Sequence, residues 1–225
     1  MHNNDGICYI IGACQEFCNN ISISPSDKDL VIAADGGYDL LKKLNIEPNI
    51  LLGDFDSILD LPLGGNIIRY PSKKDDTDTF LAYKEGLNKG YRNFIIVGGI
   101  GGRIDHTVAN LQTLSNIAEN GGRGFLITDN TVLTVIRSSK LEFDLVNSGY
   151  ISVFAIGKKA ENVSIEGLKY CADKIELHPD TPLGVSNEFI GKRASISVEK
   201  GNLLVIWNTN INDFFKTINS YLLKQ

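Results

Sequence analysis

Residues 94–106 of the chain read FIIVGGIGGRIDH. The apolar run 94–97 has the length and β-branched content of a buried strand. A glycine-dense turn follows it, and residues 107–118 then carry apolar side chains at helical spacing. A buried strand that leads through a short turn into a helix is the repeating unit of an α/β fold with a parallel sheet.

The same alternation of strand and helix runs through the first half of the chain. Strand-like apolar runs lie at 7–11, 30–34, 50–52, 67–70, 94–97 and 125–127. Helical patterns lie at 38–44, 79–87 and 107–118. Parallel strands joined by right-handed helical crossovers are the arrangement that this order predicts. We therefore expect a Rossmann-like, mostly parallel α/β domain over residues 1–130.

The pattern changes after about residue 130. Short strand-like runs, separated by Gly, Pro, Asn and Asp turns, lie at 131–136, 141–146, 150–156, 162–165, 174–177, 194–198 and 203–207. No helical pattern intervenes, and this spacing is typical of an all-β sandwich or barrel. We expect a C-terminal all-β sandwich domain over residues 131–210. The tail, 211–225, has one apolar helical stripe and should pack on its own core or on a partner.

Composition narrows the classes of function. The chain has 225 residues, of which 43% are hydrophobic, and a formal charge of −5, the profile of a soluble globular protein. Its mild acidity argues against a nucleic-acid partner, because phosphate backbones are bound by clustered Lys and Arg. No apolar run reaches the roughly 18 residues of a membrane span. The cysteines are too few for a disulfide scaffold, so we expect reduced thiols in a cytoplasmic protein: Cys8, Cys14, Cys18 and Cys171.

Acidic residues cluster directly after the predicted strands of the first half. They are Asp35, Asp54, Asp56, Asp75, Asp76, Asp78 and, beyond the glycine turn, Asp105. In an open parallel sheet the ligand binds beyond the carboxyl ends of the strands, near the point where the strand order reverses. If these strands share one sheet, their carboxylates converge at that edge.

Asp54 and Asp56 lie two residues apart, so in an extended segment both face the same side while Phe55 turns into the core. Mg²⁺ prefers a few carboxylates together with water and phosphate oxygens, which this geometry supplies. The alternative is a turn at the strand end with solvated acids and Ser57 as the N-cap of a helix.

Residues 74–78, KDDTD, resemble a loop that enters a helix. An acidic first turn complements the helix dipole, with Thr77 or Asp76 as the N-cap. The position of the segment after a strand, like that of Asp54 and Asp56, favours metal binding by its acids.

The glycine turn has the features of a phosphate site. Glycines allow backbone N–H groups to approach phosphates, the helix start favours anions, and Arg103 adds a bidentate donor. The turn is neither a GxGxxG fingerprint nor a Walker loop. His106 is either a catalytic base or, more often for such a position, a cap or packing residue.

A second glycine pair, Gly36-Gly37, follows Asp35 and offers another close approach to a nucleotide. An acidic metal site beside glycine loops indicates chemistry on a nucleotide polyphosphate.

Taken in order, these motifs resemble the thiamine pyrophosphokinase (thiamin diphosphokinase) family. The segments that carry the resemblance are 34–37, 53–57, 74–78, 101–106 with Asn110, 167–170 and 185–188. The resemblance implies an N-terminal domain that binds Mg²⁺ and ATP and a C-terminal β-sandwich. It also implies a homodimer in which thiamine lies between the α/β domain of one subunit and the β domain of the other.

The resemblance also implies residue roles. The residues around Mg²⁺ would be Asp35, Asp54, Asp56 and Asp78, with Asp75 close by. Those that face ATP would be Asp35, Gly36, Gly37, Gly101, Gly102, Arg103, Asp105 and His106. Ser186 and Asn187 would bind the aminopyrimidine of thiamine, and Tyr170 is either a cation–π partner of its thiazolium or a core residue.

The implied reaction moves the diphosphoryl group of ATP to the hydroxyl of thiamine and releases AMP. Catalysis would consist of positioning and charge neutralisation; the residues that carry it would be Asp54, Asp56, Asp75, Asp78, Arg103 and Asp105. The proton acceptor is Asp54, Asp75 or Asp105. Three rival functions remain: a diphosphokinase for a pterin-type hydroxymethyl heterocycle, a Mg-dependent phosphohydrolase, and a non-catalytic nucleotide-binding regulator.

Overall fold

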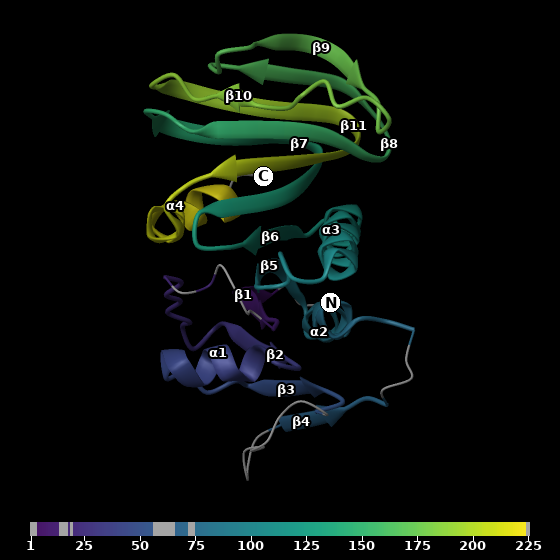
Figure 1. Ribbon diagram of the computed structural model, residues 1–225, viewed down its shortest axis with the longest axis vertical. Coiled ribbons are helices and arrows are strands. Elements are labelled where there is room, and N and C mark those ends of the chain that lie inside the picture. The colour runs from purple at the N-terminus through teal and green to yellow at the C-terminus, as the bar shows by residue number, and fades with distance from the viewer. Residues whose placement is uncertain (1–3, 14–17, 19, 56–65, 72–74, 224–225) are drawn as a thin grey trace.

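Figure 1 shows the computed structural model of the chain, which describes residues 4–13, 18, 20–55, 66–71 and 75–223. The described strands form one sheet in the order β10-β8-β11-β7-β6-β5-β1-β2-β3-β4, with β9 paired to β8. β4 lies at one end of the molecule and β9 at the other (Figure 1). The fold is mixed α/β, as the sequence predicts.

The first half of the sheet is parallel. Its strands are β1 (Asn4–Ile11), β2 (Leu30–Ala34), β3 (Ile50–Gly53), β4 (Asn66–Arg69), β5 (Tyr91–Val97) and β6 (Arg123–Ile127). The chain runs from β1 to β4 in one direction along the sheet and then returns to place β5 on the other side of β1. The strand order therefore reverses between β1 and β5, and this reversal is where open α/β sheets bind ligands.

Both faces of this half are covered, which explains why its central strands are almost wholly apolar. Alternate residues of β1 enter different cores: Tyr9 and Ile11 pack on the side of α1 (Gly37–Leu44). Cys8 and Ile10 pack on the other side, with α2 (Asp78–Asn88) and α3 (Ile104–Glu119). The period of two along each strand thus divides the apolar side chains between two cores.

The second half is built from three long antiparallel strands, β7 (Thr131–Val146), β8 (Tyr150–Glu166) and β11 (Lys192–Asn208). Each contains two of the runs that we predicted as separate strands, so that prediction is wrong. Ser138, Gly157 and Gly201 have positive φ, which bends each strand while the pairing resumes beyond the bend. Two shorter strands, β9 (Ala172–Leu177) and β10 (Asn187–Glu188), complete this half.

The bends fold the antiparallel half over itself. Residues from both sides of each bend lie in one core, such as Ile136 with Phe143 on β7 and Val198 with Leu203 on β11. This half therefore encloses a core as a sandwich does, but its strands belong to the same sheet as the parallel half. The link is the antiparallel pairing of β6 with β7. The division into an α/β domain and a β-sandwich domain stays a prediction.

The helix α4 (Ile211–Leu223) lies within the predicted tail, 211–225. Phe214 is 2% exposed, and its ring lies 5.4 Å from that of Phe125 on β6. Trp207 is 3% exposed and packs edge-on against Phe143, so it is a core residue. Of the two expectations for the tail, packing on its own core is confirmed.

Two further expectations concern the cysteines and membranes. Cys8 and Cys171 are free thiols, whereas Cys18 is disulfide-bonded, so the expectation of four reduced thiols is wrong for Cys18. Within the described residues, no helix is long and apolar enough to cross a bilayer.

Candidate functional site

The acidic segments lie at one edge of the parallel sheet. Asp35 follows β2 and Asp54 follows β3. Asp78 is the first residue of α2, which connects β4 to β5. The β2–β3 and β3–β4 pairs are parallel, so the carboxyl ends of these strands share one edge. The glycine turn between β5 and α3 leaves the same edge beside β1. The predicted gathering of acids and glycines at the carboxyl edge is therefore what the topology produces.

Asp35 and the turn that carries Asp54 are in direct backbone contact. The N–H of Asp35 donates to the carbonyl of Leu52 at 2.8 Å, and a Cβ built on Gly53 would lie 3.2 Å from the Cα of Asp35. Asp35 and Phe55 have φ values of +47° and +62°, a conformation that is rare for a bulky residue. Strained residues of this kind cluster at functional sites.

Phe55 is 6% exposed, which confirms that it turns into the core beside Asp54. The guanidinium of Arg69, on β4, lies 5.4 Å from its ring centroid. Asp56 and Ser57 lie outside the described residues, so the pairing of Asp54 with Asp56 stays a prediction.

The start of α2 approaches the end of β1. A Cβ built on Gly12 would lie 3.8 Å from Oγ1 of Thr79, so the first turn of the helix stands over that strand end. Thr77 is the N-cap, and its hydroxyl accepts from the N–H of Phe80 at 3.3 Å. The predicted capping role is therefore present. Asp78, in the first turn, is placed favourably for the helix dipole.

The neighbouring acids of this segment differ in their partners. Asp76, which precedes α2, pairs with Lys84 on that helix at 2.6 Å. Asp75 is exposed and precedes α2 by three residues. Lys74 lies outside the described residues.

The donor set fits Mg²⁺ by its chemistry. Mg²⁺ prefers carboxylate oxygens together with water and phosphate oxygens, and this edge of the sheet carries several carboxylates. Among the described residues, no three His, Cys, Asp or Glu side chains are close enough together to hold a metal ion as they stand. Asp56, the fourth predicted ligand, is not among them. The metal site is therefore a proposal, taken up below.

The glycine turn presents backbone donors. Gly98, Gly99, Gly101 and Gly102 all have positive φ, between 57° and 87°, which suits glycine. Within the described chain, the N–H groups of residues 99–102 make no hydrogen bond. Consecutive unpaired N–H groups in a turn before a helix are an arrangement that binds anions in other proteins; the role of this turn is taken up below.

Arg103 and Asp105 pair with each other instead of standing separately. Nε and Nη2 of Arg103 donate to the two carboxylate oxygens of Asp105 at 3.2 and 2.5 Å. These hydrogen bonds hold the pKa of Asp105 below its usual range and raise the pKa of Arg103. Both side chains are more than 60% exposed, so the pair costs little to open. His106 is exposed, and its backbone N–H donates to the Asp105 carboxylate at 3.1 Å, so the capping side chain here is that of Asp105. The role of the His106 imidazole stays a prediction.

The second glycine pair holds the start of α1 against β1. A Cβ on Gly37 would lie 1.8 Å from the carbonyl oxygen of Ile11, and one on Gly36 would lie 3.2 Å from Cβ of Ala13. These glycines are therefore needed for close packing between helix and strand. A contact with nucleotide stays a prediction for both.

The predicted thiamine residues lie at the edge of the antiparallel half. Ser186 is exposed with φ +58°, and its N–H donates to Oγ of Ser152 at 3.0 Å. Asn187 is 7% exposed, and its amide bonds both the N–H and the carbonyl of Tyr170, at 3.0 and 2.7 Å. In this structure the Asn187 side chain holds the turn that carries Tyr170.

Tyr170 is 59% exposed, so the expectation that it is a core residue is wrong. Nζ of Lys169 lies 5.5 Å from its ring centroid and pairs with Glu188 at 2.6 Å. A cationic ligand that stacked on Tyr170 would meet this ammonium group.

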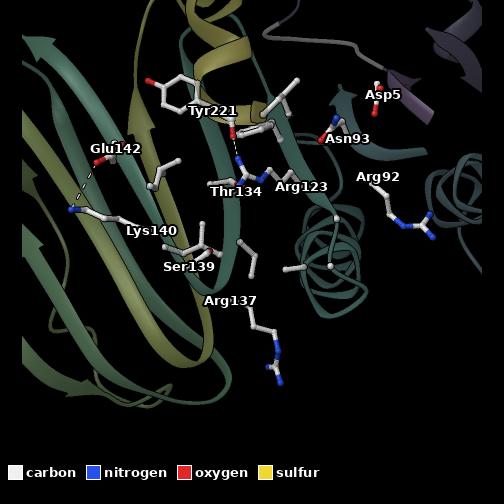
Figure 2. Close-up of a pocket in the computed structure, with 18 of the residues that line it drawn as sticks. Asp5, Arg92, Asn93, Arg123, Thr134, Arg137, Ser139, Lys140, Glu142 and Tyr221 are labelled. Atoms are coloured by element: carbon white, nitrogen blue, oxygen red, sulfur yellow. Dashed lines mark hydrogen bonds and ion pairs between the residues drawn. The ribbon is translucent and has the colours of Figure 1, made fainter. Parts of the chain in front are cut away.

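A cavity of about 620 Å³ lies at the opposite edge of the sheet (Figure 2). It is lined by the amino ends of β1, β5 and β6, by β7 on both sides of its bend, and by the end of α4. Arg123 donates to the carbonyl of Tyr221 near the end of that helix, where a cation is favoured. In Figure 2, Arg92 and Arg137 point away from Arg123, so the three cations do not form one anion cradle.

Two residues at the carboxyl edge were not assigned a role from the sequence. Asn110, on α3, is 3% exposed and donates to the carbonyl of Gly99 at 2.9 Å. Asp129, which follows β6, accepts from the N–H of Asn20 at 2.9 Å. The signal for Asp129 was its position after a predicted strand, the same signal that identified Asp35 and Asp54.

Comparison with known proteins adds the family. The sequence model described as "Thiamin pyrophosphokinase, catalytic domain" matches residues 24–125, and "Thiamin pyrophosphokinase, vitamin B1 binding domain" matches residues 137–203. The two models occur in order and together span most of the chain. The chain belongs to the thiamin pyrophosphokinase family. Of its proposed site residues, the first model covers the acids and the glycine turn, and the second covers Ser186 and Asn187.

Individual members of the thiamin pyrophosphokinase family are similar over most of their length. Thiamine pyrophosphokinase of Bacillus subtilis (strain 168) is 28% identical over 188 residues, which are 80% of this chain and 88% of that protein. Thiamin pyrophosphokinase 1 of Caenorhabditis elegans is 26% identical over 172 residues, 70% of each chain.

Solved structures of thiamin pyrophosphokinases share the fold. The crystal structure of the Bacillus subtilis enzyme has a TM-score of 0.82 at 25% identity and covers 91% of this chain and 99% of its own. That of the Geobacillus thermodenitrificans protein has a TM-score of 0.77 at 23% identity and covers 90% and 97%. The second likeness concerns the fold alone.

Proposed function

We propose that this protein is a thiamine diphosphokinase, which transfers the diphosphoryl group of ATP to the hydroxyl of thiamine and releases AMP. Membership of the family supports the activity. The single observation that carries the proposal is the placement of Asp35, Asp54, Asp78 and the glycine turn at one edge of the sheet, where the strand order reverses.

ATP would bind over the glycine turn. The unpaired N–H groups of residues 99–102 suit its phosphates. Arg103 would leave Asp105 and bind phosphate in a bidentate manner, because a guanidinium keeps its charge at any physiological pH. Gly101, Gly102, Asp105 and His106 would line this approach, with Gly36 and Gly37 on the side of α1.

Asp35, Asp54, Asp56 and Asp78 would hold Mg²⁺, with Asp75 nearby. Bound there, the ion would neutralise charge on the phosphate oxygens during transfer. The side chains themselves come from three connections of the sheet, and the backbone contact between Asp35 and Gly53 fixes two of them relative to each other.

The thiamine hydroxyl must lose a proton as it attacks the β-phosphorus. Asp54, Asp75 and Asp105 remain the candidate acceptors. While Arg103 is bound to it, Asp105 is held ionised with a lowered pKa, so it could accept the proton only after Arg103 has moved to the phosphates.

Thiamine would meet Ser186 and Tyr170 on the antiparallel half of a second subunit. Exposed apolar residues gather there, and such patches mark interaction sites; they are Leu145, Tyr150, Leu183, Val185 and Ile190. Hydrogen bonds between residues 146–153 and 184–191 bring these segments together. We propose a homodimer through this surface and a direct thiamine contact for Ser186, with Asn187 holding Tyr170.

In this proposal the parallel half, residues 1–130, acts as a Rossmann-like ATP domain. The folded-over half, residues 131–210, acts as a β-sandwich for thiamine, and 211–225 is a tail. The protein would work in the cytoplasm.

Thiamine-dependent formation of AMP tests the proposal. ATP and Mg²⁺ are incubated with thiamine, with a hydroxymethyl pterin, or with no acceptor, and the products are separated by mass. We expect AMP and thiamine diphosphate only in the thiamine reaction. AMP with the pterin alone would favour the pterin kinase, phosphate release without acceptor would favour a phosphohydrolase, and nucleotide binding without turnover would favour a regulator.

A further inference from the structure

The buried amide of Asn110 is bonded to the glycine turn. Asn110 lies in the second turn of α3 and is 3% exposed. Its Nδ2 donates to the carbonyl oxygen of Gly99 at 2.9 Å. A buried polar side chain is normally hydrogen-bonded, and the Asn110 amide is bonded to the glycine turn through the carbonyl of Gly99.

This bond determines the direction of a neighbouring N–H group. The described chain contains no cis peptide bonds, and in a trans peptide the C=O and the following N–H point in opposite directions. Because the carbonyl of Gly99 points at Asn110, the N–H of Ile100 points away from the helix. That N–H has no hydrogen-bond acceptor among the described residues, so it is open to a ligand.

Gly99 and Asn110 are matched in space. A Cβ on Gly99 would lie 2.1 Å from Nδ2 of Asn110, and the residue has φ +77°. Only glycine leaves room for the amide at this point. The pair therefore holds the turn in one conformation, in which its donors stay unpaired.

We infer that Asn110 is a positioning residue for ATP: through Gly99 it holds the Ile100 N–H, and with it the glycine turn, toward the phosphates. This inference rests on the proposed function. Donors fixed before the substrate arrives need no reorganisation, which is why their loss is costly in enzymes. The alternative is that Asn110 only packs α3 against the sheet.

The test compares Asn110→Ala and Asn110→Asp with Thr113→Ala. Thr113 is 1% exposed on the same helix, and among the described residues its hydroxyl bonds only the carbonyl of Ala109, so its loss disturbs packing but not the turn. Binding of α,β-methylene ATP with Mg²⁺ is measured by calorimetry, and KM values are measured for ATP and thiamine. We expect both Asn110 variants to bind the analogue about tenfold more weakly, the usual scale of one lost hydrogen bond to a charged group. The KM for thiamine should change less than about twofold at saturating ATP, and Thr113→Ala should leave both values unchanged.

A double-mutant cycle with Gly99→Ala completes the test. Gly99→Ala displaces the Asn110 amide, so the two changes share one effect and Asn110→Ala added to Gly99→Ala should weaken binding little further. Analogue binding unchanged in folded Asn110→Asp, or additive losses in the cycle, would overturn the inference. Failure of the unaltered protein to bind the analogue or to form AMP with thiamine would instead overturn the proposed function. If Asn110→Ala does not fold, Asn110→Asp and Gly99→Ala give the same decision.

Discussion

Asp35 and Phe55 stand at the ends of adjacent strands with positive φ. Each such conformation costs on the order of 1–3 kcal/mol and persists only where the surroundings impose it. Here the surroundings are the Asp35–Leu52 hydrogen bond and the burial of Phe55. Phe55 follows Asp54 directly, and Asp35 contacts Gly53 before it, so both residues fix the backbone on either side of Asp54.

Asp54→Asn should remove activity without unfolding the protein. The change keeps the shape of the side chain and removes one negative charge from the proposed Mg²⁺ site. We expect kcat to fall at least about hundredfold, the scale seen when a metal ligand or its support is lost, with the melting temperature unchanged within error. Steady-state kinetics and thermal unfolding check this. Near-normal Mg-dependent turnover in the folded variant would contradict the metal assignment.

Ser186 and Asn187 should separate in their effects. Ser186 is exposed, so Ser186→Ala should raise the KM for thiamine about tenfold, as for a lost hydrogen bond, and leave stability and the KM for ATP unchanged. Asn187→Ala breaks the bonds to Tyr170, so it should lower the free energy of unfolding by about 1–3 kcal/mol. Urea unfolding and substrate titrations measure both. If Ser186→Ala changed only the KM for ATP, the assignment of this loop to thiamine would be contradicted.

Sequence alone located most of the candidate site, because acids and glycines that follow buried strands must share an edge in a parallel sheet. It could not show that Asp105 pairs with Arg103 or that Asn187 is used internally. Those facts depend on side-chain distances across turns, which no spacing rule supplies.

At the scale of elements, the helices and parallel strands were predictable and the long strands were not. Residues such as Ser138 and Gly201 look like turns in the sequence, yet in the fold they bend strands that stay paired on both sides. Local turn propensity cannot distinguish a bend from a strand end, because cross-strand pairing decides between them.

Phe214→Ala should loosen α4. The ring is buried against Phe125 and Trp207, so its truncation should lower the free energy of unfolding by about 3–5 kcal/mol. Lys216→Ala on the exposed face of the same helix is the control and should change it by less than about 0.5 kcal/mol. Urea denaturation measures both. Equal small effects would show that the tail adds little to the core.

For the whole molecule, the alternation of strands and helices predicted a mixed α/β fold. The continuity of the sheet did not follow from the sequence. It depends on the pairing of β6 with β7 across a short connection, where Thr128 and Thr131 bond each other. A tight connection between adjacent antiparallel strands leaves no room for a domain linker.

Leu183→Asp should disrupt the proposed homodimer. The side chain is 65% exposed on the apolar surface beside Ser186, and a carboxylate there would oppose burial against a second copy. Light scattering should give twice the chain mass for the unaltered protein and a shift toward the monomer for the variant, with lost activity. Lys158→Asp, on an exposed part of β8 away from that surface, should remain dimeric. A monomeric, active unaltered protein would contradict the proposal.

The central claim is that acids from separate connections of the sheet bind one divalent ion beside the glycine turn. Anomalous scattering from crystals grown with Mn²⁺ and α,β-methylene ATP tests it most directly. The account predicts one strong Mn²⁺ peak at about 2.0–2.3 Å from carboxylate oxygens of Asp54 and of Asp35 or Asp78, and from a phosphate oxygen. A nucleotide bound elsewhere, or Mn²⁺ held without any of these carboxylates, would contradict it.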